Sequence, residues 1–117
     1  MKVSFDFDST LTTEPVQSLC KKFLELGAEV FVTTSRATMM YGNKPINNDD
    51  LFQLTDMLGI ARENIQFTEH DDKYKFVKDF DLHFDDDVEE IFLINQYQGK
   101  CIGLLYEEKF NNGIKDW

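Results

Sequence analysis

Two groups of acidic residues stand out because each follows a short apolar run. Asp6 and Asp8 come at the end of one run, and Asp85, Asp86 and Asp87 directly follow another. Positions i and i+2 of a strand lie on the same face, so the first pair should point the same way. Carboxylates held this close resist joint ionisation unless a cation or a proton lies between them. The pattern therefore predicts a site for a hard cation such as Mg²⁺, which prefers oxygen ligands.

Asp6 and Asp8 allow two other interpretations, a solvated turn and a calcium-binding loop. A solvated turn after a strand also favours Asp and Ser, and this interpretation stays open for the pair taken alone. A calcium loop of the EF-hand type needs Gly at its sixth position and Glu at its twelfth. Those positions hold Leu11 and Gln17, so the sequence excludes an EF-hand.

Hydroxyl and cationic side chains stand between the two acidic groups. A second apolar run ends in Thr33, Thr34, Ser35 and Arg36, and Lys73 precedes the second acidic group. A hydroxyl and an ammonium can both offset the negative charge on the oxygens of a transferring phosphoryl group. The residue types are therefore typical of phosphoryl chemistry.

The elements that must position these residues alternate between strand-length apolar runs and segments of helical period. This alternation predicts an α/β fold with a parallel sheet and crossover helices. We expect helices over Pro15–Leu26, Asp49–Leu58, Tyr74–Lys78 and Val88–Tyr97, and strands over Val3–Phe7, Val30–Thr33, Ile65–Phe67, Leu82–Phe84 and Cys101–Tyr106.

Turn residues mark the ends of the helices. Thr13 and Asn48 are candidate N-terminal caps, and Gly27 and Gly59 are expected to end the first two helices. The polar segment 35–48 is predicted as the longest loop, and the tail around Asn111, Asn112 and Gly113 as irregular chain.

Right-handed crossover connections favour the strand order 5-4-1-2-3 for this succession of elements. Ligands of open parallel sheets bind at the carboxyl ends of the strands, where neighbouring connections diverge. The order therefore predicts that Asp6, Asp8, Asp85 and Asp86 converge at one edge of a three-layer, Rossmann-like domain.

Composition limits the classes of protein to be considered. A chain of 117 residues with 42% hydrophobic residues should form a single domain over residues 1–117. Its net charge of −10 argues against strong non-specific nucleic-acid binding. Neither a membrane-length apolar segment nor a signal-peptide pattern is found, so no membrane association and a cytoplasmic location are expected. Cys20 and Cys101 are expected to be buried free thiols.

These residues resemble the four motifs of the haloacid dehalogenase (HAD) superfamily of phosphohydrolases, in the family's order and over nearly the whole chain. The first motif is Asp6-Phe7-Asp8-Ser9-Thr10, with Ser9 where many members have Gly. The second is matched by Thr34, next to Thr33. The third is a lysine, Lys73 in preference to Lys75 or Lys78. The fourth is Asp85-Asp86.

The resemblance implies a Mg²⁺-dependent phosphomonoester hydrolase. Asp6 would be the nucleophile that forms an aspartyl-phosphate, and also a metal ligand. Asp8 would be the general acid and base, with its backbone carbonyl on the metal. Thr34 and Lys73 would hold the phosphoryl oxygens, and Asp85 and Asp86 would complete the metal site. The second aspartate of the first motif points to phosphoester hydrolysis or phosphotransfer, and argues against dehalogenation.

The spacing between the motifs leaves no room for the cap domain that many members carry, so an open site is expected, used for macromolecular ends or completed by homo-oligomerisation. Within the superfamily, the chain looks like the phosphatase domain of phage-type polynucleotide kinases and the 5'(3')-deoxyribonucleotidases. This likeness suggests a nucleotide or a nucleic-acid terminal phosphate as substrate. The candidate substrate contacts are Ser9, Thr10, Ser35, Arg36, Tyr41 and Lys44, with Met39, Met40 and Tyr41 as a hydrophobic lip that stacks a base or packs on the body.

Other functions follow from other interpretations of the same residues. The chain could be a non-catalytic HAD-like module that binds Mg²⁺ and phosphate or serves as a scaffold. A receiver domain is excluded, because its phosphorylated Asp follows the third strand, where this chain has Thr68. His70 and His83 are interpreted as ordinary side chains without a metal.

Overall fold

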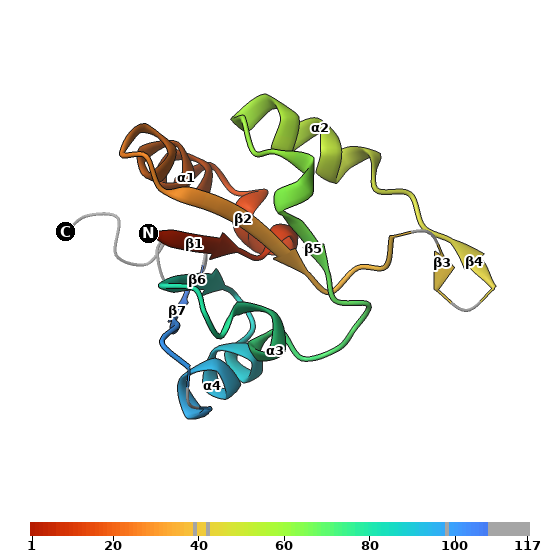
Figure 1. The fold of residues 1–117 in the computed structure, drawn as a ribbon. Coiled ribbons are helices and arrows are strands. Elements are labelled where there is room, and N and C mark those ends of the chain that lie inside the picture. The colour runs from red at the N-terminus through yellow and green to blue at the C-terminus, as the bar shows by residue number, and fades with distance from the viewer. Residues whose placement is uncertain (39, 42, 98, 108–117) are drawn as a thin grey trace.

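The chain folds around one parallel sheet of five strands, as a computed structural model shows (Figure 1). The sheet contains, in spatial order, β5 (Ile65–Phe67), β2 (Glu29–Thr34), β1 (Lys2–Phe5), β6 (Leu82–Asp85) and β7 (Ile102–Leu105), and every neighbouring pair is parallel. This is the predicted order, read from the opposite edge. The structure describes residues 1–38, 40–41, 43–97 and 99–107.

Helices cover both faces of the sheet and give it three layers (Figure 1). On one face lie α1 (Glu14–Glu25) and α2 (Asp49–Leu58), and on the other α3 (Tyr74–Val77) and α4 (Val88–Gln96). Two single turns, η1 (Phe7–Leu11) and η2 (Arg62–Asn64), lie in the connections. The predicted α/β class is confirmed, and each predicted helix begins and ends within one residue of its observed bounds.

The long connection after β2 contains a short antiparallel pair that the sequence did not predict. β3 (Met40–Tyr41) pairs with β4 (Lys44–Pro45) within the segment expected to be a loop. This hairpin extends beyond the sheet (Figure 1). The prediction for Met39 and that for the tail at 111–113 lie outside the described residues, as do the side chains of Met40 and Tyr41.

The capping predictions are correct in position but wrong in mechanism. Thr13 and Asn48 are the N-cap residues of α1 and α2, yet neither side chain accepts a hydrogen bond from the helix. The Asn48 amide instead donates to the carbonyls of Ala37 and Thr38, at 3.0 and 3.2 Å. Asn48 therefore holds the end of the β2–α2 connection against its beginning. The cap of α2 at its other end is as expected, since Gly59 has φ 88°.

The first strand ends earlier than predicted, at Phe5 rather than Phe7. The chain tightens there into η1, where the Leu11 N–H donates to the Asp6 carbonyl at 3.1 Å. Ser9 has φ 60°, in the left-handed region that leads the chain away from the strand. The prediction that Asp6 and Asp8 share one face of a strand is therefore wrong, because the residues between and after them form a turn.

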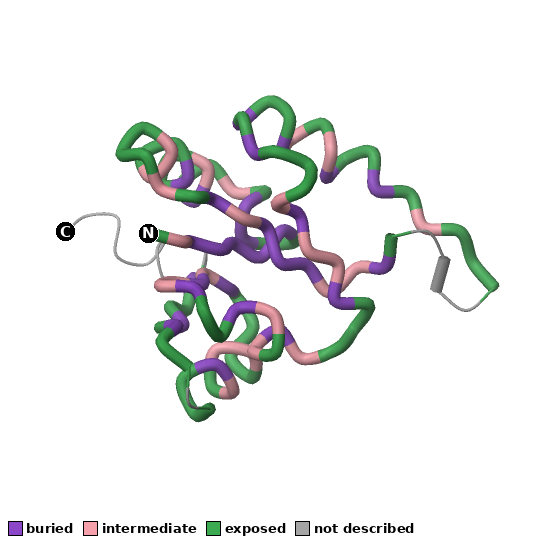
Figure 2. Tube along the Cα trace, in the orientation of Figure 1, coloured by how far each residue is buried: buried purple, intermediate pink, exposed green. Residues whose placement is uncertain are grey.

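Most of the buried apolar side chains lie in one cluster between the sheet and the helices α1 and α2 (Figure 2). Phe5 stacks on Phe84 at 5.1 Å between ring centroids, and Cys20 is buried in this cluster. A smaller cluster, containing Cys101, lies on the α3/α4 side. Both thiols are free, as expected, and burial raises their pKa to about 11, which keeps them inert.

The sheet face toward α3 and α4 carries a row of buried polar side chains. The Ser4 and Thr33 hydroxyls are 2.7 Å apart, and the Thr33 hydroxyl donates to Gln66 Oε1 at 2.8 Å. His83 lies opposite Ser4 in the register of β1 and β6 and is fully buried. These bonds satisfy most of the polar groups that the alternation of the strands turns toward this face.

Across the described residues, none of the helices is sufficiently long and apolar to span a bilayer.

Candidate functional site

A buried ammonium group joins the ends of two central strands. Lys73 Nζ lies 2.6 Å from Asp6 Oδ1 and 2.7 Å from Asp85 Oδ2. Asp6 directly follows β1 and Asp85 ends β6, so both carboxylates lie at the carboxyl edge of the sheet. The convergence of Asp6 and Asp85 that the strand order predicts is therefore found.

The structure distinguishes between the three lysines that the sequence left open. Lys73 is buried, and its backbone N–H donates to Glu90 Oε2 at 3.1 Å, which ties the start of α3 to α4. Lys75 points outward and pairs with Asp71 at 2.9 Å, and Lys78 is exposed. Of these three, only Lys73 reaches the acidic cluster.

Burial and charge act differently on the two carboxylates that Lys73 bridges. Burial raises the pKa of Asp6 to about 8, although the Lys73 charge works in the opposite direction. Burial also disfavours ionisation of Asp85, but the hydrogen bond from His83 and the Lys73 charge outweigh it and lower the pKa of Asp85 to about 2. Burial opposes the charge of Lys73 as well, yet the two carboxylates raise its pKa above the ordinary value. The single positive charge of Lys73 is shared by two carboxylates, so it does not fully compensate the negative charge of Asp6.

His83 is a site residue that the sequence interpretation missed. Its Nε2 lies 2.9 Å from Asp85 Oδ2, and both side chains are fully buried. Burial lowers the pKa of His83, so the ring is neutral and its Nε2–H donates to the carboxylate, which can only accept. His83 and Asp85 are two residues apart on β6 and share a face, a spacing that could have identified the contact.

Three carboxylates form a group that fits a cation. Oxygen atoms of Asp6, Asp85 and Asp86 all lie within 4.8 Å of one another. The Thr10 hydroxyl lies 3.2 Å from both Asp6 Oδ2 and Asp86 Oδ1 and joins these two side chains. The donors are all oxygen atoms, and Asp6 lacks compensating charge, so the residues present fit a hard divalent ion such as Mg²⁺. The Asp8 carboxylate is not part of this group.

The Asp8 side chain instead faces Arg36. The guanidinium donates to both Asp8 oxygens, at 3.1 and 2.8 Å, and to both Asp50 oxygens, at 2.8 and 2.9 Å. It also stacks over the Phe7 ring, with 4.9 Å from Cζ to the ring centroid. Asp50 is a second residue that the sequence interpretation missed, because a distant helix start supplies it.

An open cavity of about 310 Å³ brings most of the predicted site residues together. Its walls contain both acidic groups, the lysine and two of the predicted substrate contacts, namely Asp6, Asp8, Ser9, Ser35, Lys73, Asp85, Asp86 and Asp87. The Asp87 side chain also accepts from the N–H groups of Glu89 and Glu90 and so caps α4.

Some predicted contacts lie outside the walls of this cavity. Thr34 is buried, and its hydroxyl accepts from the Arg36 N–H at 3.3 Å. Thr10 is buried, and its hydroxyl contacts the carboxylates of Asp6 and Asp86. Lys44 is exposed on β4, in the hairpin that extends beyond the sheet (Figure 1).

Comparison with protein-family models finds no matching family, and comparison with curated protein sequences finds no similar protein.

Proposed function

We propose that this chain is a HAD-type phosphatase, a Mg²⁺-dependent hydrolase of phosphomonoesters that acts through an aspartyl-phosphate. The observation that carries the proposal is the buried Lys73 ammonium between Asp6 and Asp85, with Asp86 close enough to share a cation with them. A structural ion pair would not need the third carboxylate or an open cavity. Both suit phosphoryl transfer, because the open cavity admits the phosphoryl group and a cation held by the carboxylates would offset the charge on its oxygens.

In the first step, a carboxylate oxygen of Asp6 attacks the phosphorus atom and the ester P–O bond breaks. Asp8 donates a proton to the departing oxygen, which leaves as an alcohol. Asp8 suits this role because its exposed side chain lines the cavity that Asp6 and Lys73 also line, and its carboxylic acid form carries the proton that the departing oxygen takes. The contact with Arg36 fixes the direction of the Asp8 side chain, and the carboxylate that makes this contact is the form that takes a proton in the second step.

In the second step, Asp8 takes a proton from a water molecule that attacks the aspartyl-phosphate, and inorganic phosphate leaves. Lys73 offsets charge on the phosphoryl oxygens in both steps. Asp6, Asp85 and Asp86 would hold Mg²⁺, which supplies further positive charge to the phosphoryl group. The resemblance to the superfamily implies two further contacts. The backbone carbonyl of Asp8 would bind the metal, and the Thr34 hydroxyl would hold a phosphoryl oxygen.

The proposed substrate class comes from the resemblance to polynucleotide kinase phosphatase domains and deoxyribonucleotidases, and the connections around the cavity support an open site. Between Asp8 and Thr34 the chain forms only η1 and α1 before β2. The connection from Thr34 to Lys73 contains the β3–β4 hairpin, α2, η2 and β5. These short elements support the proposal that the chain has no cap domain, and we infer an open site for nucleotides or for nucleic-acid terminal phosphates.

The test is hydrolysis of p-nitrophenyl phosphate and of a panel of nucleotides and 3'- or 5'-phosphorylated oligonucleotides, with Mg²⁺ and with EDTA. We expect Mg²⁺-dependent turnover that Asp6→Asn abolishes. The matched control is Asp79→Asn, the same substitution at an exposed position outside the cavity, which should keep full activity. Equal inactivity of the wild type and Asp6→Asn on every substrate would favour a non-catalytic module that binds Mg²⁺ and phosphate.

A further inference from the structure

A second cavity, of about 340 Å³, lies beside the first and shares Asp8 and Ser35 with it. Its remaining lining residues come from the β2–α2 connection and the β5–α3 connection, and they are Arg36, Ala37, Ile46, Asn47 and His70. Because Asp8 and Ser35 belong to both cavities, a molecule whose phosphate lies by Asp6 can extend from the first cavity into the second. The volume is at the lower end of the range for small-molecule sites, enough for one ring or one sugar.

The charges around this second cavity do not favour an anion. Arg36 is its one cationic lining residue apart from His70, among the residues that the structure describes. Four hydrogen bonds already direct the guanidinium to the carboxylates of Asp8 and Asp50. The guanidinium charge is therefore shared by two carboxylates, of which Asp8 lines the cavity and Asp50 lies outside its walls, and it is not available to an anionic ligand. Ser35 and Asn47 supply uncharged polar groups.

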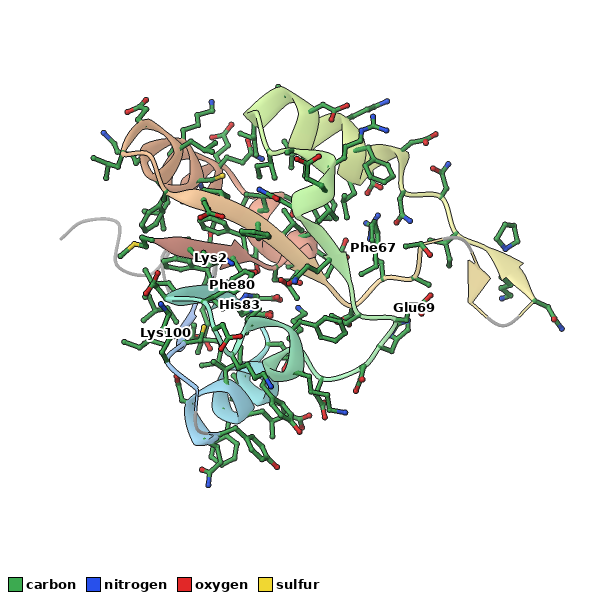
Figure 3. All side chains as sticks on the ribbon, in the orientation of Figure 1. Lys2, Phe67, Glu69, Phe80, His83 and Lys100 are labelled. Carbon is green, nitrogen blue, oxygen red and sulfur yellow. The ribbon has the colours of Figure 1, made fainter. Side chains whose placement is uncertain are left out.

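One wall of the second cavity is fixed by an uncommon backbone conformation. Glu69 and His70 have φ 54° and 67°, two consecutive non-glycine residues in the left-handed region. Glu69 lies in the connection from β5 to α3 (Figure 3). The Glu69 N–H donates to the Arg36 carbonyl at 3.2 Å, and the His70 N–H donates to the Ser35 carbonyl at 2.8 Å. These bonds hold the two connections together, so the cavity is preformed.

We infer that the second cavity binds the leaving group of the substrate and selects an uncharged polar one. This inference rests on the proposed function and narrows its substrate class to nucleoside monophosphates and other phosphomonoesters with an uncharged leaving group. Phosphorylated oligonucleotides fall outside it, because a phosphodiester lies next to their terminal phosphate. Phosphomonoesters whose remaining structure is neutral are accepted, and those with a second phosphate or a carboxylate near the ester are disfavoured. Arg36 therefore acts in specificity as the partner of Asp8 and Asp50, and is not a phosphate contact.

The test uses two substrates of the same shape that differ by one charge, 3-carbamoylphenyl phosphate and 3-carboxyphenyl phosphate. Release of inorganic phosphate gives kcat/KM for each in the presence of Mg²⁺. We expect the amide to be preferred by about tenfold, as one like charge at the rim of a protein cavity would require.

The variant Asp50→Asn removes one negative charge from Arg36 and should reduce this preference by roughly fivefold. The matched control is Asp56→Asn, also on α2, where the carboxylate pairs with Arg62 at 2.8 Å outside both cavities. Both variants change the net charge equally, so only a local effect distinguishes them. Asp56→Asn should keep the wild-type ratio.

Binding of the matching benzylphosphonates, measured by calorimetry with Mg²⁺, separates this inference from the proposed function. Tighter binding of the carbamoyl compound, weakened in Asp50→Asn alone, supports the selective cavity even if no substrate is hydrolysed. Equal binding of the two compounds, preference for the carboxylate, no binding of either, or the same change in Asp56→Asn would overturn it.

Discussion

Replacing Lys73 by Met tests whether this ammonium is what allows two buried carboxylates to lie side by side. The Lys73 side chain is 3% exposed and contacts Asp6 and Asp85 at 2.6 and 2.7 Å. Met keeps the length and the apolar stem, so the substitution removes mainly the charge. Removing one partner of a buried ion pair costs about 3–5 kcal/mol. In a chain of this size each kcal/mol lowers Tm by about 4 °C, which predicts a fall of about 12–20 °C.

The loss of stability should depend on pH in a defined direction. Burial raises the pKa of Asp6 to about 8, above the value of about 4 in an unfolded chain. The native state therefore keeps a proton that the unfolded state releases, and stability falls as the pH rises from about 4 to 8. Without the Lys73 charge the pKa of Asp6 rises further. The deficit of Lys73→Met should thus be larger at pH 9 than at pH 6.

The assay is urea unfolding in EDTA at both pH values, repeated with Mg²⁺. Saturating Mg²⁺ at about 100 times its Kd should restore about 2.7 kcal/mol. The control is Lys75→Met, because Lys75 forms an exposed ion pair with Asp71 and should have little effect. An unchanged midpoint of Lys73→Met at pH 9, or a larger deficit at pH 6, would refute the electrostatic argument.

Three further substitutions test separate parts of the molecule. Asp8→Asn should keep Mg²⁺ binding but lower kcat about 10²–10⁴-fold, and unchanged turnover would remove Asp8 from proton transfer. His83→Phe removes the N–H donor to Asp85 and should weaken Mg²⁺ binding about 10–100-fold in calorimetry. An unaltered affinity would show that this contact does not orient the carboxylate. Leu51→Ala should cost about 2–5 kcal/mol in urea unfolding because Leu51 is fully buried, whereas Leu26→Ala, at an 82% exposed position, should leave the midpoint unchanged.

The parts of the site that the sequence predicts are those fixed by the order of the strands. Asp6 follows β1 and Asp85 ends the adjacent parallel strand β6. Right-handed connections bring these strand ends together independently of side-chain conformation. The alternation of apolar runs was sufficient to predict this order. The sequence favoured Lys73 over Lys75 and Lys78, but it did not predict the burial of Lys73, which depends on how a helix of four residues packs.

The features of the site that the sequence does not predict depend on the local backbone conformation and on partners far away in the chain. The direction of the Asp8 side chain depends on a turn in which Ser9 has a positive φ. A serine does not predict this conformation. The contact between Arg36 and Asp50 joins a strand end to the start of a helix after a long connection. The hydrophobic periodicity of the sequence does not predict such a contact.

The unequal packing on the two faces of the sheet implies an order in which the molecule opens. On the α3/α4 side the apolar cluster is small, and the row from Ser4 through Thr33 to Gln66 replaces apolar packing with hydrogen bonds. Segments with few buried apolar contacts exchange their amide hydrogens through local opening, at a lower free energy than global unfolding. Lys73 belongs to this weaker half, whereas Asp6 follows directly from a strand packed in the larger cluster. A ligand that contacts both residues therefore joins the weakly packed side of the sheet to the strongly packed side, and we expect its binding to increase the protection of the α3 and α4 amides.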